Sequence, residues 1–352
     1  MTVRNIALAA LILTAGLLTR PGQAGSQERP VRPADQAPGE GFWADYRFIP
    51  GDRVLFYEDY RGLPVTELPP RLEILKGAPK LTERSNHRFL LVNRHAAFRI
   101  TLPDTLPANF TLEFDLWLPG GVVSVFCPVG DGQNFRQKPF FQFRANESGV
   151  KFGHSAGAVS DLTRGGPIRD LWNCRIAGDG KRLTMYVNNT RIADTPDPGF
   201  LRGKQIQFDV QNSSREDILF GPIRVAEGRA RTLAEALAAE GRAITHGITF
   251  DPDDDRLRPE STPVLKEIAA LLQDNPKLRL QIEVHTDNSG DYKSNQERSQ
   301  RQAVAVREFL VSHFELNEDR LSAKGFGESK PIASGSTPEA AQENLRVEIV
   351  KR

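Results

Sequence analysis

The chain has 352 residues, and its charge is nearly balanced because 46 lysines and arginines oppose 45 aspartates and glutamates. This length favours two globular domains over one. The net charge of +1 offers no basic face of the kind that nucleic-acid binding requires, so no nucleic-acid partner is expected.

Residues 1–24 have the pattern of an export signal. Arg4 supplies the positive start, residues 6–19 form an apolar core too short to span a bilayer comfortably, and Gly22-Gln-Ala24 offers small residues at a cleavage site. An uncleaved membrane anchor is the alternative, but Arg20 and Pro21 interrupt the apolar run. We therefore expect an exported protein. Residues 25–40 are polar and rich in proline and glutamine, which predicts a flexible linker.

Residues 41–226 predict an all-β domain. Short runs of β-branched and aromatic residues alternate with turn signals such as Pro50-Gly-Asp52 and Gly178-Asp-Gly180. The expected strands are residues 53–57, 89–92, 97–100, 110–117, 140–143, 173–176, 182–187 and 206–210. Eight or more strands at this spacing indicate a sandwich.

One hairpin carries a resemblance within this region. Gly178-Asp-Gly-Lys181, followed by Tyr186-Val-Asn188, resembles the hairpin of concanavalin A-like (laminin-G-like) jelly-roll domains, and the block 110–115 suits the same class. The resemblance implies a fold that often binds sugars through exposed aromatic and amide groups. The candidates are Trp117, Phe141, Phe143, Trp172, Tyr186 and Asn188. Because Trp117 and Trp172 lie in apolar strands, we expect both in the core.

A glycosidase would need two carboxylates at a defined separation on one face. Glu113 and Asp115 share a face of one strand, but such a lone pair is more typical of a solvated sandwich edge. We therefore predict no enzyme, with a wall-associated glycoside hydrolase as the alternative.

Cysteine and histidine placement leaves one question open. In an exported chain, Cys127 and Cys174 favour a disulfide. Each also lies in an apolar strand, where a free thiol serves as a small core residue. The six histidines have no ligand spacing, so no metal and no cofactor are expected.

Residues 227–243 predict a helical connector, since Leu233, Leu237 and Ala238 recur at helical spacing and Gly241 is a plausible stop. The following region, residues 244–352, predicts an α+β domain with the order β-α-β-α-β-β. Strands are expected at 244–250, 278–284, 320–324 and 345–350, helices at 260–275 and 295–313, and a short turn or helix at 338–343. The acidic loop 251–255 lacks the glycine and terminal glutamate of a calcium loop, so we expect it to be exposed to solvent.

The stretch 278–314 predicts a ligand site. Alternation in residues 278–284 indicates a half-buried strand, Thr286-Asp-Asn-Ser-Gly290 makes a polar turn, and Ala303, Val306 and Leu310 recur on one face of a helix. A carboxylate at the end of this strand would face polar side chains on the helix.

Five motifs in this region, in order, resemble the OmpA-like peptidoglycan-binding domain of OmpA, MotB and the Pal lipoproteins. They are Gly247-Ile-Thr-Phe-Asp251, residues 257–265, His285-Thr-Asp-Asn288, residues 325–332 and Asn344-Leu-Arg-Val-Glu348. In that family, the aspartate of the Thr-Asp motif and an arginine on the next helix hold the zwitterionic end of diaminopimelate. A carboxylate takes the ammonium, and a guanidinium takes the carboxylate with two parallel bonds.

The resemblance implies a set of site residues. By position they are Asp287, Thr286, Asn288, Asn295, Arg298, Gln302, Asn344 and Arg346. Three positions depart from the family pattern: Gln302 falls where the family has its arginine, Val284 replaces a glycine, and Leu345 replaces the first arginine of the last motif. Arg298, one turn before Gln302, could reach the site, whereas Arg301 should point elsewhere.

The sequence therefore predicts an all-β jelly-roll sandwich followed by an OmpA-like domain, in a non-enzymatic envelope protein. The resemblance implies a location in the periplasm, associated with the cell wall or outer membrane. Peptidoglycan is the expected partner, and the sandwich would bind a carbohydrate or an envelope protein. In the alternative, the jelly roll is a glycoside hydrolase or carbohydrate-binding module and the C-terminal domain only docks it.

Overall fold

The structure, a computed structural model, describes residues 37–84, 87–126, 141–146, 149–153, 159–162, 171–196, 203–251 and 255–352. The predicted export signal and Cys127 lie outside these ranges. No helix within them is both long and apolar enough to cross a membrane. Of the predicted linker, residues 37–40 are described, and the N–H of Gly39 donates to Thr262 Oγ1 at 2.7 Å, so this part is attached to the fold.

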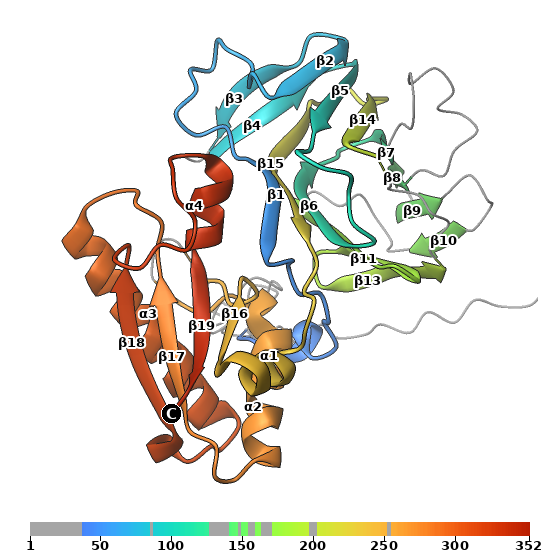
Figure 1. Cartoon of the computed structure of the whole chain (residues 1–352). Coiled ribbons are helices and arrows are strands. Elements are labelled where there is room, and N and C mark those ends of the chain that lie inside the picture. The colour runs from blue at the N-terminus through green and yellow to red at the C-terminus, as the bar shows by residue number, and fades with distance from the viewer. Residues whose placement is uncertain are drawn as a thin grey trace, which may run out of the picture. The chain divides into compact units, whose positions relative to one another are not determined.

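Residues 53–227 form two antiparallel sheets, preceded by the short 3-10 helix η2 (Gly41–Trp43) (Figure 1). The first sheet has the order β13-β12-β11-β6-β15-β4-β3, with β1 also paired to β15. Its strands are β1 (Arg53–Glu58), β3 (Lys80–Arg84), β4 (His87–Val92), β6 (Asn109–Trp117), β11 (Trp172–Asp179), β12 (Arg182–Val187), β13 (Thr190–Pro196) and β15 (Ile218–Glu227).

The second sheet has the order β10-β9-β8-β7-β14-β5-β2. Its strands are β2 (Leu72–Lys76), β5 (His95–Thr101), β7 (Gly121–Phe126), β8 (Phe141–Asn146), β9 (Gly149–Gly153), β10 (Val159–Leu162) and β14 (Gln205–Gln211). All eight predicted runs overlap observed strands. The named runs did not include β2, β3, β7, β9, β10 and β13. They also missed β15, which is central to the first sheet, because Gly221 and Pro222 interrupt its sequence at a break in register.

The two sheets share one apolar core. Alternation along β6 buries Phe110, Leu112, Phe114 and Leu116, as a period of two requires. The Phe114 ring meets Phe208 of β14 edge to face, with ring centroids 5.5 Å apart. The sheets therefore pack face to face, and the mostly β prediction for this region is confirmed.

Two of the predicted sugar-binding aromatics, Phe143 and Trp172, belong to this core, and Tyr186 belongs to a separate cluster with Trp43, Tyr46 and Phe48. The side chains of Phe143 and Tyr186 are buried, so the expectation of an exposed aromatic platform is wrong for these two. Trp172 is also buried, as its place in an apolar strand predicted. The ring of Tyr186 meets that of Tyr46 edge to face, with ring centroids 5.4 Å apart. Trp117 is half-buried, which is less than the core placement predicted for it. The side chain of Phe141 lies outside the described part of the chain.

Asn188 and Cys174, which the sequence analysis also singled out, both have structural roles in this region. Asn188 sits in a turn, where its Oδ1 accepts from the N–H of Asn173 at 2.9 Å. Cys174 is a buried free thiol, and burial raises its pKa well above the usual value. This is the core role that one of the two cysteine alternatives assigned to it.

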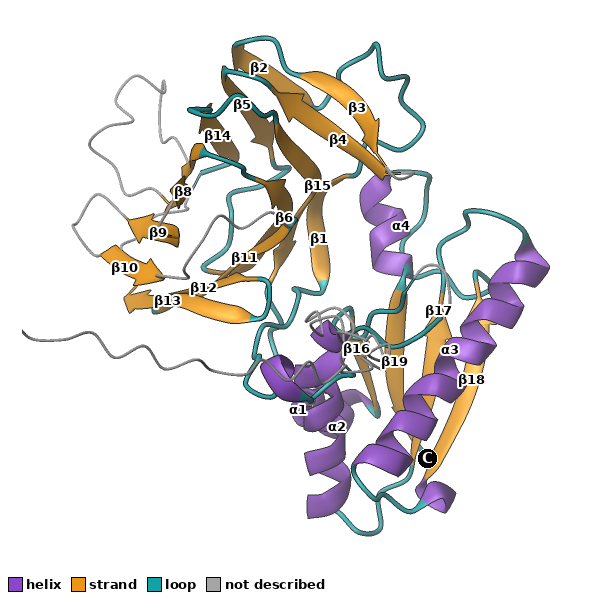
Figure 2. Cartoon of the chain, turned by 180° about the vertical axis from the view of Figure 1, so that it is seen from behind, coloured by secondary structure: helices purple, strands orange, loops and turns teal. Residues whose placement is uncertain are grey.

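Residues 242–352 form a four-stranded sheet with the order β16-β19-β17-β18, in which only β17 and β18 are parallel (Figure 2). The strands are β16 (Arg242–Thr245), β17 (Leu280–His285), β18 (Leu321–Gly327) and β19 (Arg346–Lys351). The helices are α1 (Leu233–Glu240), η4 (Pro259–Ser261), α2 (Thr262–Asp274), α3 (Tyr292–His313), η5 (Glu318–Arg320) and α4 (Pro338–Asn344). The elements follow the predicted order.

One face of this sheet packs on the helices in a second core. Ile282 and Val284 of β17 lie there with Ile268 of α2 and with Val306 and Leu310 of α3. Because β17 alternates, its polar residues lie on the opposite face. Helix α3 runs along β18 and so places its side chains beside the end of β17 (Figure 2).

Two predicted boundaries differ from the structure. The strand predicted at 244–250 ends at Thr245, and the backbone continues as a loop bridged from Phe250 to Leu257. The connector was predicted as a helix over residues 227–243. Its first residue, Glu227, is the end of β15, and the helix begins at Leu233, after the N-cap Thr232, which forms a capping box with Glu235. Its predicted stop at Gly241 is confirmed by a left-handed φ of 68°.

Candidate functional site

Asp287 lies directly after β17, in the polar turn that the sequence predicted. The residue is buried, and its Oδ1 accepts hydrogen bonds from Ser289 N at 3.1 Å and Ser289 Oγ at 2.5 Å. The preceding Thr286 donates its N–H to the Gly327 carbonyl at 3.0 Å, which fixes the turn to β18. The carboxylate is therefore held in one orientation by local bonds of a kind that aspartate favours in turns.

Asn295 ties this turn to the first helical turns of α3. Its Nδ2 lies 3.0 Å from the Ser289 carbonyl, 3.4 Å from the Asp287 carbonyl and 2.7 Å from Glu328 Oε2. The helix begins at Tyr292, and its N-cap Asp291 accepts from Ser294 N at 2.9 Å. Asn295 therefore positions the Asp287 turn.

Three side chains of α3 converge on the carboxylate of Asp255. Arg298 Nε donates to Oδ1 at 2.9 Å, Gln302 Nε2 donates to the same oxygen at 3.0 Å, and Arg301 Nε donates to Oδ2 at 3.0 Å. Residues three and four apart face one side of a helix, which explains the convergence. Burial alone would raise the pKa of Asp255, but hydrogen bonds from Arg301, Arg298 and Gln302 outweigh it and lower the pKa.

This carboxylate corrects two predictions. The loop 251–255 was expected to be exposed, and its residues 252–254 lie outside the described part of the chain. The Asp255 side chain is only 14% exposed because the helix holds it. Arg301 was expected to point elsewhere. Its side chain is 61% exposed, yet its guanidinium still reaches Asp255. Sequence reasoning missed Asp255 because the residues that hold it lie 43 to 47 positions further along the chain.

A cavity of about 420 Å³ opens beside Asp287. Six of the eight predicted site residues line it, namely Thr286, Asp287, Asn295, Arg298, Gln302 and Arg346. Apolar walls come from Ile248, Phe250, Val284, Leu345 and Val347, and residues that precede the C-terminal domain, Pro50, Arg61, Glu113 and Arg224, also line the cavity. Asn288 is exposed and does not line the cavity, and neither does Asn344.

Asn344 and Arg346 support the cavity wall through hydrogen bonds. Asn344 Oδ1 accepts from the N–H groups of Ile332 and Ala333 at 2.9 and 3.1 Å. Arg346 donates to Glu348 Oε1 at 2.8 Å through Nε and to the Lys330 carbonyl at 2.9 Å. The polar groups of both side chains therefore form hydrogen bonds within the protein.

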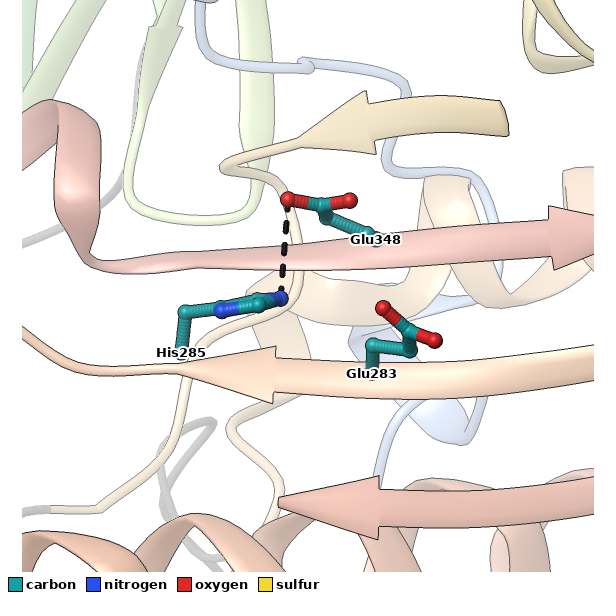
Figure 3. Close-up of side chains that lie close together, drawn as sticks. All are labelled: Glu283, His285 and Glu348. Atoms are coloured by element: carbon teal, nitrogen blue, oxygen red, sulfur yellow. Dashed lines mark ion pairs between the residues drawn. The ribbon is translucent and has the colours of Figure 1, made fainter. Parts of the chain in front are cut away.

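The face of the sheet that points away from the helices carries a buried cluster of Glu283, His285 and Glu348 (Figure 3), of which His285 also lines the cavity. His285 Nε2 lies 3.5 Å from Glu348 Oε1, and one ligand atom from each residue lies within 4.8 Å of the others. Burial and the charges of Arg346, Lys330 and Arg242 lower the pKa of His285 to about 3.

This donor set could ligate a metal ion. The histidine spacing did not predict it, because strand register alone brings β17 and β19 together. Both oxygens of Glu348 already accept from arginines, however. Arg346 Nε donates to Oε1 at 2.8 Å and Arg242 donates to Oε2 at 2.6 Å. We therefore assign Glu348 to ion pairs with Arg346 and Arg242, beside a neutral His285.

Comparison with known proteins supports the resemblance that the five motifs predicted. Residues 249–345 match the sequence profile of the OmpA family. Motility protein B of Bacillus subtilis is 37% identical over 124 residues, which cover 34% of this chain and 48% of that protein. Outer membrane porin F of Pseudomonas aeruginosa is 36% identical over 110 residues, 31% of each chain. Peptidoglycan-binding protein ArfA of Mycobacterium bovis is 37% identical over 109 residues, 31% of this chain and 33% of that protein.

The similarity to these three relatives covers about a third of this chain. The chain spans between about a third and about a half of the length of these relatives. Their names describe motility, outer-membrane and peptidoglycan-binding proteins, and none of the three names is that of an enzyme. Residues 249–345 are an OmpA family domain.

Proposed function

We propose that this chain is a non-enzymatic cell-envelope protein whose OmpA family domain tethers it to peptidoglycan. The domain binds the diaminopimelate end of the stem peptide without forming a covalent bond. The observation that carries the proposal is the buried, oriented carboxylate of Asp287 at the wall of a cavity, with Arg298 and Gln302 of α3 on the same wall. The name of ArfA supports it, because that relative is a peptidoglycan-binding protein.

Asp287 suits the ammonium group of diaminopimelate. Its Oδ1 accepts from Ser289, while its Oδ2 has no hydrogen-bond partner among the residues that the structure describes. A charge-assisted bond from an ammonium to Oδ2 would be short and about twice as strong as a neutral one. The apolar walls would pack against the methylene chain between the two ends of diaminopimelate.

The two-sheet domain would be a concanavalin A-like jelly roll that the tether holds near the cell wall. It would present a carbohydrate or an envelope protein site, and the export signal would deliver the chain to the periplasm, where it associates with the wall or the outer membrane. A relative named as an outer membrane porin supports this location.

The competing proposal, a glycoside hydrolase on this domain, has less support. Both carboxylates of the pair that motivated this proposal already have partners in the protein. Glu113 accepts a hydrogen bond from Arg224 at 2.8 Å and lies 3.7 Å from Arg175. Asp115 accepts from Asn173 at 2.6 Å. Burial raises the pKa of Asp115. Although Glu113 lines the cavity, its ion pairs with Arg224 and Arg175 hold its charge within the protein.

Sedimentation with isolated peptidoglycan sacculi tests the tether. Wild type should pellet with sacculi, and Asp287→Ala should bind at least about tenfold more weakly, because it removes the charged acceptor. Asp274→Ala, which removes an exposed carboxylate at the end of α2, is the matched control and should pellet like wild type. The proposal fails if wild type stays in the supernatant or if Asp287→Ala pellets equally well.

A further inference from the structure

We infer that the cavity selects a stem peptide whose diaminopimelate end carries a carboxamide in place of a free carboxylate. This inference rests on the proposed function and specifies the ligand of the same site. The observation that supports it is the hydrogen bond from Gln302 to Asp255.

Asp255 fixes which way the Gln302 amide points. Gln302 is buried, and its Nε2 donates to Asp255 Oδ1 at 3.0 Å. The reverse orientation would place the amide oxygen against an ionised carboxylate, which repels it. Oε1 must therefore point away from Asp255. No described residue donates to it, and Gln302 lines the cavity.

The cavity thus presents two acceptors, Gln302 Oε1 and the Asp287 carboxylate. A ligand end with an ammonium and a carboxamide offers donors to both. A free carboxylate offers only acceptors at the second position and adds a negative charge near Asp287 and Asp255. Where the family places a guanidinium, this chain places an uncharged amide whose oxygen, an acceptor, points away from Asp255.

The arginines that line the cavity do not replace the missing guanidinium as partners of a ligand carboxylate, because acceptors of the protein itself bond to each one. Arg298 donates to Asp255, and Arg346 donates to Glu348 and to the Lys330 carbonyl. Arg224 donates to Glu113 at 2.8 Å, and Arg61 pairs with Asp59. A ligand carboxylate would therefore meet cations whose charge an internal carboxylate already balances.

Calorimetric titration of the full chain with two synthetic stem tripeptides tests the preference. The peptides differ only in whether the side-chain carboxyl of diaminopimelate is free or amidated. We expect wild type to bind the amidated peptide about tenfold more tightly, the scale of one hydrogen bond made or left unmade. Gln302→Leu should remove the preference, whereas Gln273→Leu, at an exposed position on α2, should keep it. The double variant Asp255→Asn with Gln302→Arg should reverse it.

The outcomes separate the two proposals. Equal or tighter binding of the free acid, still lost in Asp287→Ala, would overturn the preference and leave the tether intact. Binding of neither peptide would overturn both.

Discussion

Gly325 of β18 lies directly against Ser299 of α3. A Cβ on Gly325 would come within 2.5 Å of Ser299 C and 2.1 Å of the Gln300 backbone nitrogen, far inside van der Waals contact. Two hydrogen bonds lock this approach: Gly325 N donates to Gln300 Oε1 at 2.9 Å, and Gly327 N donates to Ser299 Oγ at 2.8 Å. The glycine therefore sets how closely the helix of the site packs on the sheet.

Gly325→Ala should destabilise the protein by about 3 kcal/mol, because the helix backbone must move to admit the methyl group. Urea unfolding measures this. Gly290→Ala is the comparison, since Gly290 has a φ of 90° but no atom within 4 Å of an added Cβ. It should cost only about 1 kcal/mol, from backbone strain. Equal costs for the two variants would contradict the packing argument.

Replacing Asn295 should loosen the Asp287 turn. Asn295→Ala removes a donor that Ser289 and Glu328 share and leaves part-buried acceptors without it, at a cost of about 1 kcal/mol. Binding to sacculi should weaken with it. The exposed Asn288 lies in the same turn, and Asn288→Ala should change stability by less than about 0.5 kcal/mol. The idea is wrong if both variants unfold at the wild-type urea concentration.

The buried His285 makes stability depend on pH. Its pKa is about 3 in the folded protein, below the ordinary 6.5, so the unfolded chain binds a proton more readily between these values. The contribution of His285 is therefore complete above pH 6.5 and decreases as the pH falls toward 3. Urea unfolding from pH 7 to pH 4 should show this loss, and His285→Asn should have a flatter profile. Parallel profiles would contradict the assignment.

Glu113 should stabilise the two-sheet domain through its ion pairs. Glu113→Gln leaves the buried Arg224 without its charged partner and should cost about 2 kcal/mol. Glu83→Gln is the control, because Glu83 is about half exposed and lies 3.5 Å from Arg88. Its expected cost is below about 0.5 kcal/mol. If Glu113→Gln proves neutral while a glycan-hydrolysing activity disappears, the hydrolase alternative gains support.

Local patterns were enough to predict the part of the site that lies close together in sequence. The alternation that ends at Val284, the polar turn around Asp287 and the helical spacing of Val306 and Leu310 gave a strand, a turn and a helix in their observed order. Asn295 follows Asp287 by eight positions, so one strand–turn–helix unit brings them together without help from distant residues. The same local logic predicted the alternating core positions of β6.

Contacts between distant segments could not be predicted in this way. Asp255 reaches Gln302 across 47 positions, and His285 meets Glu348 only because β17 and β19 pair in one register. The sequence by itself determined the elements and the carboxylate of Asp287, because propensity and periodicity act over a few residues. Only the tertiary structure decided that Asp255 neutralises the helix's cations and turns the Gln302 amide, since that depends on where two distant segments pack.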